Sequence, residues 1–245
     1  MRKRADELLA AGGLSRSRAQ ALIMAGEVSA AGRAVAKAGE MWPAETVFTV
    51  TPRRRFVSRG GVKLEGALAD FGLDVGGLNA LDVGASTGGF TDCLLQHGAA
   101  RVTAVDVGRA LMDARLASED RVTLVEGVNA RYLADAGLGH EFDLAVLDVS
   151  FISLALVLPP AAGLVRRSGR LLALVKPQFE VGRDRVGKKG VVRNQADIDA
   201  AVARIKALGP ALSPPRPVLG EAPSRLPGPR GNREVFVLFG PGSDP

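Results

Sequence analysis

Cysteine and histidine are scarce in this sequence, which has one cysteine and two histidines among its 245 residues. A single cysteine cannot build a disulfide framework, so Cys93 is expected to be a small buried side chain in a reducing, cytoplasmic compartment. His97 and His140 have no cysteine or acidic cluster at ligand spacing around them. The composition therefore predicts a cytoplasmic protein without a metal site.

Long apolar runs are also missing. Residues 1–7 are mostly charged and lack the apolar stretch of a signal peptide. The most apolar long window, residues 144–165, contains Asp148 and the pair Pro159-Pro160, which fit a buried strand and a helix start better than a membrane span. We therefore expect no membrane partner.

The basic charge is concentrated near the N-terminus. Residues 1–63 contain 12 Lys and Arg against 5 Asp and Glu, a net charge of +7, whereas the remainder contains 20 against 21. With 47% hydrophobic residues, the chain is long enough for one large core and a small second module. A basic module on a near-neutral body indicates binding to a polyanion, most often a nucleic acid. The alternative is a basic surface that only keeps the protein soluble.

Residues 1–52 have the pattern of a small α+β module. Helices are predicted over residues 4–12 and 16–25, and short strand-like pieces at 27–30, 34–35 and 46–50. The segments Arg4-Ala5-Asp6, Ser15 to Ile23 and Gly26-Glu27-Val28 resemble an RNA-binding module first seen in a protein of the small ribosomal subunit. Arg4, Arg16 and Arg18 are therefore candidate RNA contacts. The last two lie at a helix start, where backbone N–H groups also meet phosphate.

A run of arginines follows this module. We predict a basic linker over residues 53–60, which contains Arg53, Arg54, Arg55 and Arg59. These arginines belong either to a solvated hinge or to the RNA-binding surface. Their position beside a basic module favours the RNA-binding surface.

From residue 61 to residue 245, predicted helices alternate with predicted strands. Strands are expected at residues 80–83, 101–106, 122–126, 143–148, 170–175 and 234–239, and helices at 63–71, 91–97, 110–116, 154–165 and 195–208. This alternation is typical of an α/β, Rossmann-like fold with a mostly parallel sheet and helices on both faces. Ligands of such sheets bind outside the carboxyl ends of the strands, so Asp82, Asp106, Asp148 and Lys176 are expected to face one crevice.

Residues 209–230, with seven prolines, are expected to form a long extended loop.

A glycine-rich loop follows the first of these strands, in the segment Ala80-Leu81-Asp82-Val83-Gly84-Ala85-Ser86-Thr87-Gly88-Gly89-Phe90. A strand, a tight glycine loop and a helix start suit a cofactor that contains a nucleoside, because glycine lets the backbone approach the ligand closely. Ser86 stands where the dinucleotide pattern Gly-x-Gly-x-x-Gly has its middle glycine. Asp106, about twenty residues further on, can bind the ribose of either NAD or S-adenosylmethionine.

Asp82, just before the loop, favours one of these two cofactors. A carboxylate attracts the cationic amino and sulfonium groups of S-adenosylmethionine, whereas it repels the pyrophosphate of NAD. We therefore expect S-adenosylmethionine.

Four polar residues stand in apolar settings further along the chain: Lys63, Asp148, Lys176 and Glu234. Singly, a lysine or a glutamate at the end of an element is common. Together they resemble the Lys-Asp-Lys-Glu tetrad of the FtsJ-like ribose 2′-O-methyltransferases. A lysine can take a proton from a ribose hydroxyl only if burial or a second cation lowers its pKa well below about 10.4. Lys176 is the candidate base, Lys63 the neighbouring cation, and Asp148 and Glu234 the groups that orient the lysines and balance their charge.

Nearly the whole sequence resembles the TlyA (haemolysin A) family of ribosomal RNA methyltransferases, in which such an RNA-binding module precedes an FtsJ-like domain. The segments that carry the resemblance are Ser58 to Leu64, Asp82 to Phe90, Asp148 to Ser153, Leu174 to Glu180 and Gly231 to Glu234. The resemblance implies 2′-O-methylation of a cytidine in ribosomal RNA, with S-adenosylmethionine as the donor and ribosomal RNA or ribosomal subunits as the partner.

The same resemblance, together with the loop, gives the candidate cofactor contacts. These are Asp82, Gly84, Ser86, Thr87, Gly88, Gly89, Phe90, Asp106, Asn129 and Asp148. Family members often have an aromatic residue near Ala114, and this chain has none. This departure concerns the packing around the cofactor's adenosine rather than the reaction.

A second basic segment, residues 183–193, holds five basic residues and one acid. We interpret it as a mobile loop that binds RNA phosphates through Lys188 and Lys189, and the alternative is a solvated loop.

Two other functions compete with the methyltransferase: a non-catalytic RNA-binding factor for ribosome assembly, and a membrane-active haemolysin. The presence of all four tetrad residues speaks against the first. The lack of a signal, a spanning helix and a basic amphipathic helix speaks against the second.

Overall fold

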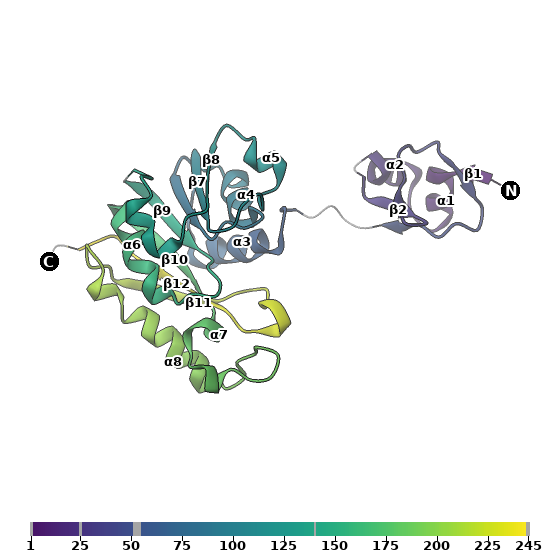
Figure 1. The fold of residues 1–245 in the computed structure, drawn as a ribbon. Helices are drawn as coiled ribbons and strands as arrows, with labels where there is room; N and C mark the ends of the chain where they lie inside the picture. Colours follow the sequence, from purple (N-terminus) through teal and green to yellow (C-terminus); the bar gives the residue numbers. More distant parts are fainter. Residues whose placement is uncertain (1, 25, 51–54, 140, 244–245) are drawn as a thin grey trace. The chain divides into compact units, whose positions relative to one another are not determined.

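The structure, a computed structural model, describes all residues except 1, 25, 51–54, 140 and 244–245 (Figure 1). Contacts within the chain divide it into two compact units, Met1–Arg55 and Phe56–Pro245. This division falls inside the linker predicted over residues 53–60. Phe56 is buried, and Ser58 caps the next helix with an Oγ that accepts the N–H of Gly60. Residues 56–60 are therefore packed into the larger unit.

The N-terminal unit packs two helices against short antiparallel strands. Its elements are β1 (Arg2–Arg4), α1 (Ala5–Ala11), α2 (Arg16–Met24), β2 (Val28–Ala30), β3 (Arg33–Ala34), β4 (Met41–Pro43) and β5 (Thr49–Val50). β1 pairs with β4, and β2 lies between β3 and β5. Leu9, Leu22 and Ile23 from the helices share one buried core with Trp42. The sequence pattern does not predict β1, because its three residues are all basic and its partner strand is distant in the chain.

A buried carboxylate joins the start of α1 to α2. Asp6 is fully buried and accepts hydrogen bonds from Arg4 at 2.9 and 3.0 Å and from Gln20 at 2.8 Å. Arg16 approaches the same carboxylate to within 3.4 Å. The hydrogen bond from Arg4 holds the pKa of Asp6 well below its usual range, and Gln20 and Arg16 add to this effect. Because an uncompensated buried charge is costly, these contacts fix α1 against α2.

A seven-stranded sheet runs through the larger unit. Its strands are β6 (Asn79–Val83), β7 (Arg101–Asp106), β8 (Val122–Glu126), β9 (Phe142–Leu147), β10 (Val165–Val175), β11 (Val218–Pro223) and β12 (Val235–Phe239). The spatial order is β11-β12-β10-β9-β6-β7-β8. The five strands from β10 to β8 are parallel, whereas β12 is antiparallel to both β10 and β11. The predicted α/β fold with a mostly parallel sheet is confirmed.

Helices cover both faces of this sheet (Figure 1). They are α3 (Arg59–Phe71), α4 (Gly89–Gln96), α5 (Ala114–Ala117), α6 (Leu158–Leu164), α7 (Pro177–Glu180) and α8 (Gln195–Lys206), with short 3₁₀ turns η1 (Ala130–Asp135), η2 (Leu154–Leu156), η3 (Arg183–Arg185), η4 (Gly209–Ala211) and η5 (Pro229–Gly231). Side chains of α3, α4 and α5 share one core with Ala80 and Val102. Side chains of α6 and α8 share the core on the opposite face with Leu81 and Val83.

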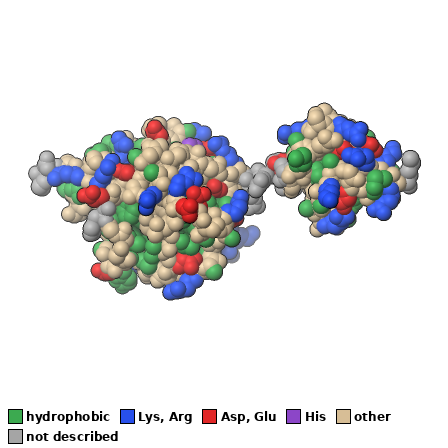
Figure 2. Space-filling model, turned by 90° about the horizontal axis from the view of Figure 1, so that it is seen from above, with side chains coloured by type: hydrophobic (Ala, Val, Ile, Leu, Met, Phe, Trp, Pro, Cys, Tyr) green, Lys and Arg blue, Asp and Glu red, His purple; other side chains and the backbone are tan. Residues whose placement is uncertain are grey.

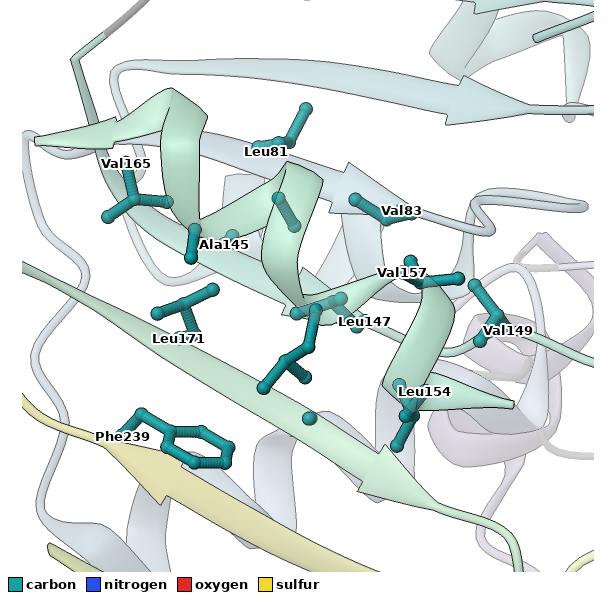
Figure 3. Packing of buried hydrophobic residues seen from close by; sticks show 14 of the residues in the cluster. Leu81, Val83, Ala145, Leu147, Val149, Leu154, Val157, Val165, Leu171 and Phe239 are labelled. Atoms are coloured by element: carbon teal, nitrogen blue, oxygen red, sulfur yellow. The ribbon is translucent and has the colours of Figure 1, made fainter. Parts of the chain in front are cut away.

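The second of these cores gathers side chains from five neighbouring strands, β12, β10, β9, β6 and β7. Figure 3 shows Leu81 and Val83 of β6, Ala145 and Leu147 of β9, Leu171 of β10 and Phe239 of β12 together with Leu154 and Val157. Each fully buried leucine or phenylalanine contributes about 2 kcal/mol from the removal of apolar surface from water. Because successive residues of a strand face opposite sides, Asp82 faces away from this core and toward α4.

Three predicted segments differ from the structure. Residues 209–230, expected to be an extended loop, contain β11, which tolerates Pro223 because it is the last residue of an edge strand. The helix expected over 110–116 is only the short α5, which begins after the capping residue Asp113. The helix expected over 154–165 is split into η2 and α6 at Val157.

The Asp6 contacts give a prediction for stability. The only tryptophan of the chain, Trp42, is buried in the N-terminal unit, so its fluorescence follows the unfolding of that unit. Asp6→Ala removes the carboxylate that Arg4, Gln20 and Arg16 share and leaves Arg4 only its longer contact with Glu7, at 3.8 Å. We expect it to lower the free energy of unfolding by about 2 kcal/mol, the scale of hydrogen bonds to a charged group. The stabilisation by Asp6 is fully present above about pH 4 and is lost as the pH falls below that.

Glu7→Ala is the matched control, because Glu7 is an exposed acid that also faces Arg16, at 3.3 Å. Urea unfolding followed by Trp42 fluorescence should shift for Asp6→Ala and stay within about 0.5 kcal/mol for Glu7→Ala. Equal midpoints for the native chain and Asp6→Ala would show that this carboxylate does not hold the unit together.

Candidate active site

The sheet reverses its strand order at β6. From β6 the chain runs to β7 and β8 on one side and then returns to β9 and β10 on the other. Such a switch point leaves a crevice at the carboxyl ends of the two central strands, and here these are β6 and β9. Gly84 directly follows β6 and Asp148 directly follows β9. The crevice thus lies between the glycine-rich loop and the loop that starts at Asp148.

Gly84 sets how closely these two loops approach. Its φ is +88°, and a Cβ at this position would lie 2.6 Å from the carbonyl oxygen of Asp148. A side chain there would push the loops apart, so glycine is required both for its conformation and for the close approach.

The larger of two hollows in the crevice has a volume of about 740 Å³, which is in the range of small-molecule sites. Its polar lining includes Asp106 and Asn129, and its apolar lining includes Val107, Leu111 and Ile152. The Asp106 carboxylate accepts the backbone N–H groups of Ser86 at 2.8 Å and of Gly108 at 2.7 Å. A planar base between the apolar walls and a ribose at the carboxylate would fit these surroundings.

The smaller hollow, of about 210 Å³, adjoins the larger one. Gly84, Ser86 and Asp148 line both. The rest of its wall comes from the start of α3, the end of the glycine loop and a later segment: Ser58, Arg59, Gly60, Lys63, Ala85, Thr87, Gly89, Phe90 and Pro227. Two ligands held in the two hollows would therefore meet beside Asp148.

Lys63 and Glu234 form a buried ion pair at the smaller hollow. The Nζ of Lys63 donates to Glu234 Oε2 at 2.5 Å, and the two residues are only 7% and 2% exposed. The backbone at Gly228 covers the carboxylate so closely that a Cβ there would lie 2.1 Å from Glu234 Oε1. Next to this point, the carbonyl of Pro227 accepts a hydrogen bond from Arg59 at 2.9 Å. The pair is thus closed off on one side by the segment that precedes β12.

Lys176 and Asp148 form the second ion pair, in which the lysine is buried and the carboxylate side chain is 20% exposed. The Nζ of Lys176 lies 2.5 Å from Asp148 Oδ1 and donates to Ser150 Oγ at 2.9 Å. Lys176 is 8% exposed and follows β10 directly, so it stands at the carboxyl edge of the strand next to β9. Lys176 lines neither hollow, but its partner Asp148 lines both. An amine held at this position can, in its neutral form, accept the proton of a hydroxyl group.

All four residues of the predicted tetrad therefore lie around one crevice, as two lysine–carboxylate pairs. Sequence reasoning did not specify which lysine meets which acid, and it missed Ser150. This serine lies in the segment Asp148 to Ser153, quoted above as part of the resemblance, but nothing in the sequence shows that its hydroxyl reaches Lys176.

The structure places the predicted cofactor contacts unevenly. Gly84, Ser86, Asp106, Asn129 and Asp148 line the larger hollow, and Thr87, Gly89 and Phe90 line the smaller one. Gly88 and Asp82 line neither.

Asp82 does not face the crevice as predicted. Its carboxylate is fully buried and accepts the hydroxyl of Thr91 in α4 at 2.7 Å. The alternation of β6 explains this, because Asp82 points to the face of the sheet that α4 covers. Burial raises the pKa of Asp82 from 3.8 to about 7, although the hydrogen bond from Thr91 opposes this shift. A direct contact of Asp82 with a ligand in either hollow is therefore not supported.

The predicted RNA contacts of the N-terminal unit differ in their surroundings. Arg4 and Arg16 are both bound to Asp6, so part of their charge holds the unit together. Arg18 is exposed, and no ion pair holds its side chain in the part of the chain that the structure describes. Lys and Arg side chains are spread over the face of this unit seen in Figure 2. Arg53 and Arg54 lie outside the described residues, and Arg55 is exposed.

The second basic segment, residues 183–193, makes hydrogen bonds and an ion pair with the larger unit, and its predicted mobility stays a prediction. The side chain of Asn232 donates to the carbonyl of Gly190 at 2.9 Å and accepts the N–H of Val192 at 3.1 Å. Arg185 pairs with Asp197 of α8 at 3.0 Å. Lys188 and Lys189 are exposed on this segment.

No helix among the described residues is both long and apolar enough to cross a membrane. Within the same residues, no group of three or more His, Cys, Asp or Glu side chains is placed to hold a metal ion. His140 lies outside them.

Comparison with known proteins places this site in a family. Residues 56–239 match the FtsJ-like methyltransferase family. The chain is 43% identical over 244 residues to the 16S/23S rRNA (cytidine-2′-O)-methyltransferase TlyA of Mycobacterium tuberculosis, a match that covers 96% of this chain and 89% of that protein. It is 38% identical over 201 residues to hemolysin A of Brachyspira hyodysenteriae, with 81% of each chain covered.

Solved structures agree with this result. A protein from Streptococcus thermophilus designated a hemolysin is 38% identical and superposes with a TM-score of 0.71, covering 100% of this chain and 90% of that one. An S-adenosylmethionine-dependent methyltransferase from Listeria monocytogenes, at 13% identity, shares the fold with a TM-score of 0.52 over 76% of this chain and 100% of that one.

The burial of Asp82 predicts a pH-dependent stability. The unfolded chain loses this proton near pH 4, while the folded protein keeps it up to about pH 7, so Asp82 destabilises the folded state increasingly between these values. Asp82→Asn has no proton to lose and keeps an acceptor for Thr91. Its stability relative to the native chain should rise from pH 4 to pH 7, by at most about 1.4 kcal/mol per pH unit.

Urea unfolding followed by far-UV circular dichroism at pH 5 and pH 7 measures this difference. A difference between Asp82→Asn and the native chain that is the same at both pH values would contradict the assignment of a raised pKa to Asp82.

Proposed function

The chain belongs to the TlyA branch of the FtsJ-like methyltransferase family, and we propose that it transfers a methyl group from S-adenosylmethionine to the ribose 2′-hydroxyl of a cytidine in ribosomal RNA. One observation carries the proposal: two buried lysines each pair with a carboxylate beside the crevice, and one member of each pair, Lys63 and Asp148, lines the smaller hollow. A site for hydride transfer or for hydrolysis would not need two buried lysines beside one acceptor position.

The larger hollow fits the donor. Its apolar walls at Val107, Leu111 and Ile152 suit an adenine, and Asp106 suits the ribose hydroxyls. The backbone at Gly84 leaves room where any side chain would intrude. When bound, S-adenosylmethionine supplies an electrophilic methyl group on a cationic sulfur.

The acceptor ribose would enter through the smaller hollow. Its hydroxyl is a poor nucleophile, so the protein must align it with the methyl group and favour the loss of its proton. We assign the proton-accepting role to the Nζ of Lys176, which Asp148 and Ser150 hold in place. Lys63 adds a second positive charge beside the reacting oxygen, and Glu234 fixes Lys63 and balances its charge. Lys176 must be the neutral amine at this step, because an ammonium has no lone pair to accept a proton. The new O–C bond then forms as the S–C bond breaks, and the hydroxyl proton passes to the amine.

The N-terminal unit would bind the ribosomal RNA. Exposed Arg18 and the basic side chains around it can contact phosphate without reading sequence. Arg55, the last residue of the N-terminal unit, is a further candidate contact, and Arg59, Lys188 and Lys189 are the candidate contacts of the larger unit. Since Arg59 lines the smaller hollow, it can hold a phosphate next to the target ribose.

A methyl-transfer assay tests this function. The native chain is supplied with labelled S-adenosylmethionine and ribosomal subunits that lack the modification, and the RNA is then digested to nucleosides. We expect label in 2′-O-methylcytidine. Lys176→Ala should lower the rate by about 10²- to 10⁴-fold, the usual contribution of a proton-transfer group.

Lys206→Ala is the matched control, because Lys206 is a partly exposed lysine of α8 whose only charged partner among the described residues is Glu221, at 2.8 Å. It should label RNA like the native chain. Labelling by Lys176→Ala at the native rate would refute the role of Lys176. No labelling by the native chain on any ribosomal particle would favour a non-catalytic assembly factor.

A further inference from the structure

The alignment of the Lys176–Asp148 pair depends on one short loop. Residues 148–153 connect β9 to η2, and two of them, Asp148 and Ser150, contact the Nζ of Lys176. Lys176 belongs to a different segment, at the start of α7. The distance between the amine and its two partners is therefore set by how the 148–153 loop sits on α7.

This loop has an unfavourable backbone conformation at its centre. Phe151 has a φ of +64°, in the left-handed region that a bulky residue rarely adopts, and its side chain is 91% exposed. Its ring contacts the ring of Phe179 in α7, with a centroid distance of 5.1 Å. A strained loop keeps one conformation only when surrounding contacts hold it, so a restraint is needed on its far side.

Glu180, the last residue of α7, supplies such a restraint. Its side chain is almost completely buried, and both carboxylate oxygens bind the end of the loop. Oε2 accepts the hydroxyl of Ser153 at 2.7 Å, and Oε1 accepts the backbone N–H of Leu154 at 2.8 Å. The two bonds tie the exit of the loop to the same short helix that begins just after Lys176.

Arg204 makes the burial of this carboxylate possible. From α8, its guanidinium donates to Glu180 Oε2 at 2.6 Å and to the carbonyl oxygen of Glu180 at 2.5 Å. A buried carboxylate without a cation would cost far more than its hydrogen bonds return. Neither residue lines the two hollows or contacts the tetrad. We call Glu180, with Ser153, Leu154 and Arg204, the Glu180 clamp.

We propose that Glu180 is a positioning residue for methyl transfer: the Glu180 clamp fixes the 148–153 loop on α7 so that Asp148 and Ser150 meet Lys176. Its effect on catalysis rests on the proposed function. Its effect on the loop does not, because hydrogen exchange reports the loop directly.

Glu180→Gln tests the clamp with little change in shape. The amide nitrogen of glutamine cannot accept a hydrogen bond, so one of the two loop bonds is lost, and Arg204 loses its counter-ion. Asp143→Asn is the matched control. Asp143 lies at the opposite end of β9, where its largely buried carboxylate accepts the N–H of Asn79 at 2.7 Å and pairs with Arg166 at 2.5 Å. Both variants remove a carboxylate charge that binds one arginine and one backbone N–H.

Three quantities are measured on the full chain: hydrogen exchange of the amides of residues 148–154, the melting temperature, and kcat and KM for methyl transfer. For Glu180→Gln we expect exchange in the loop to become about tenfold faster or more. We expect kcat to fall on the order of 10- to 100-fold, with KM for RNA changed less than about threefold, because alignment rather than binding is lost. Asp143→Asn should lower the melting temperature without changing loop exchange or kcat.

The proposal is overturned if loop exchange or kcat in Glu180→Gln matches that in Asp143→Asn. If Glu180→Gln does not fold, Ser153→Ala removes the hydroxyl bond to Glu180 together with the 3.2 Å bond by which the same hydroxyl caps η2 at Ala155. It leaves the bond of Glu180 to Leu154 and should shift both quantities in the same direction by a smaller factor. If the native chain methylates no ribosomal RNA, the proposed function fails, and unchanged exchange in the variant would still refute the clamp separately.

Discussion

A lysine ammonium can be buried in a protein only together with an opposite charge, because taking an unpaired ion out of water costs several kcal/mol. This protein buries two such lysines, Lys63 and Lys176, within one crevice. Glu234 compensates the first and Asp148 the second, and the four residues come from four separate segments of the chain. The crevice therefore exists only when the whole larger unit is folded, and removing either acid would leave a charged group without a partner.

The remaining features of the site follow from this requirement and from the sheet. The order of the strands brings the ends of β6 and β9 together, which places Asp148 beside the glycine loop. The absence of a side chain at Gly84 lets the two loops touch, and the backbone at Gly228 closes over Glu234. Glu180 binds the far end of the loop that begins with Asp148, through Ser153 and Leu154. The methyl donor and the acceptor ribose would thus meet at Asp148. Ion pairs with Glu234 and Asp148 would hold the two lysines beside this point.

Much of the fold could be predicted because its signals are local. The apolar run from Ala80 to Val83 followed by Gly84 identifies a strand and a loop without any knowledge of the rest of the chain. The features that escaped prediction depend on contacts between distant residues. The direction of Asp82 depends on which face of β6 the helix α4 covers, and the pairing of Lys63 with Glu234 joins residues 171 positions apart. β11 lies in a proline-rich segment, and only its place at the sheet edge makes its one proline, Pro223, compatible with a strand.

A crystal structure with S-adenosylhomocysteine, the product that remains after methyl transfer, would test most directly the claim that the two hollows form one donor–acceptor site. The account predicts that the adenosine lies in the larger hollow, with its ribose hydroxyls on Asp106. The sulfur should point past Gly84 toward Asp148 and the smaller hollow. A ligand bound outside this crevice, or one whose sulfur points away from the two lysine pairs, would contradict the account.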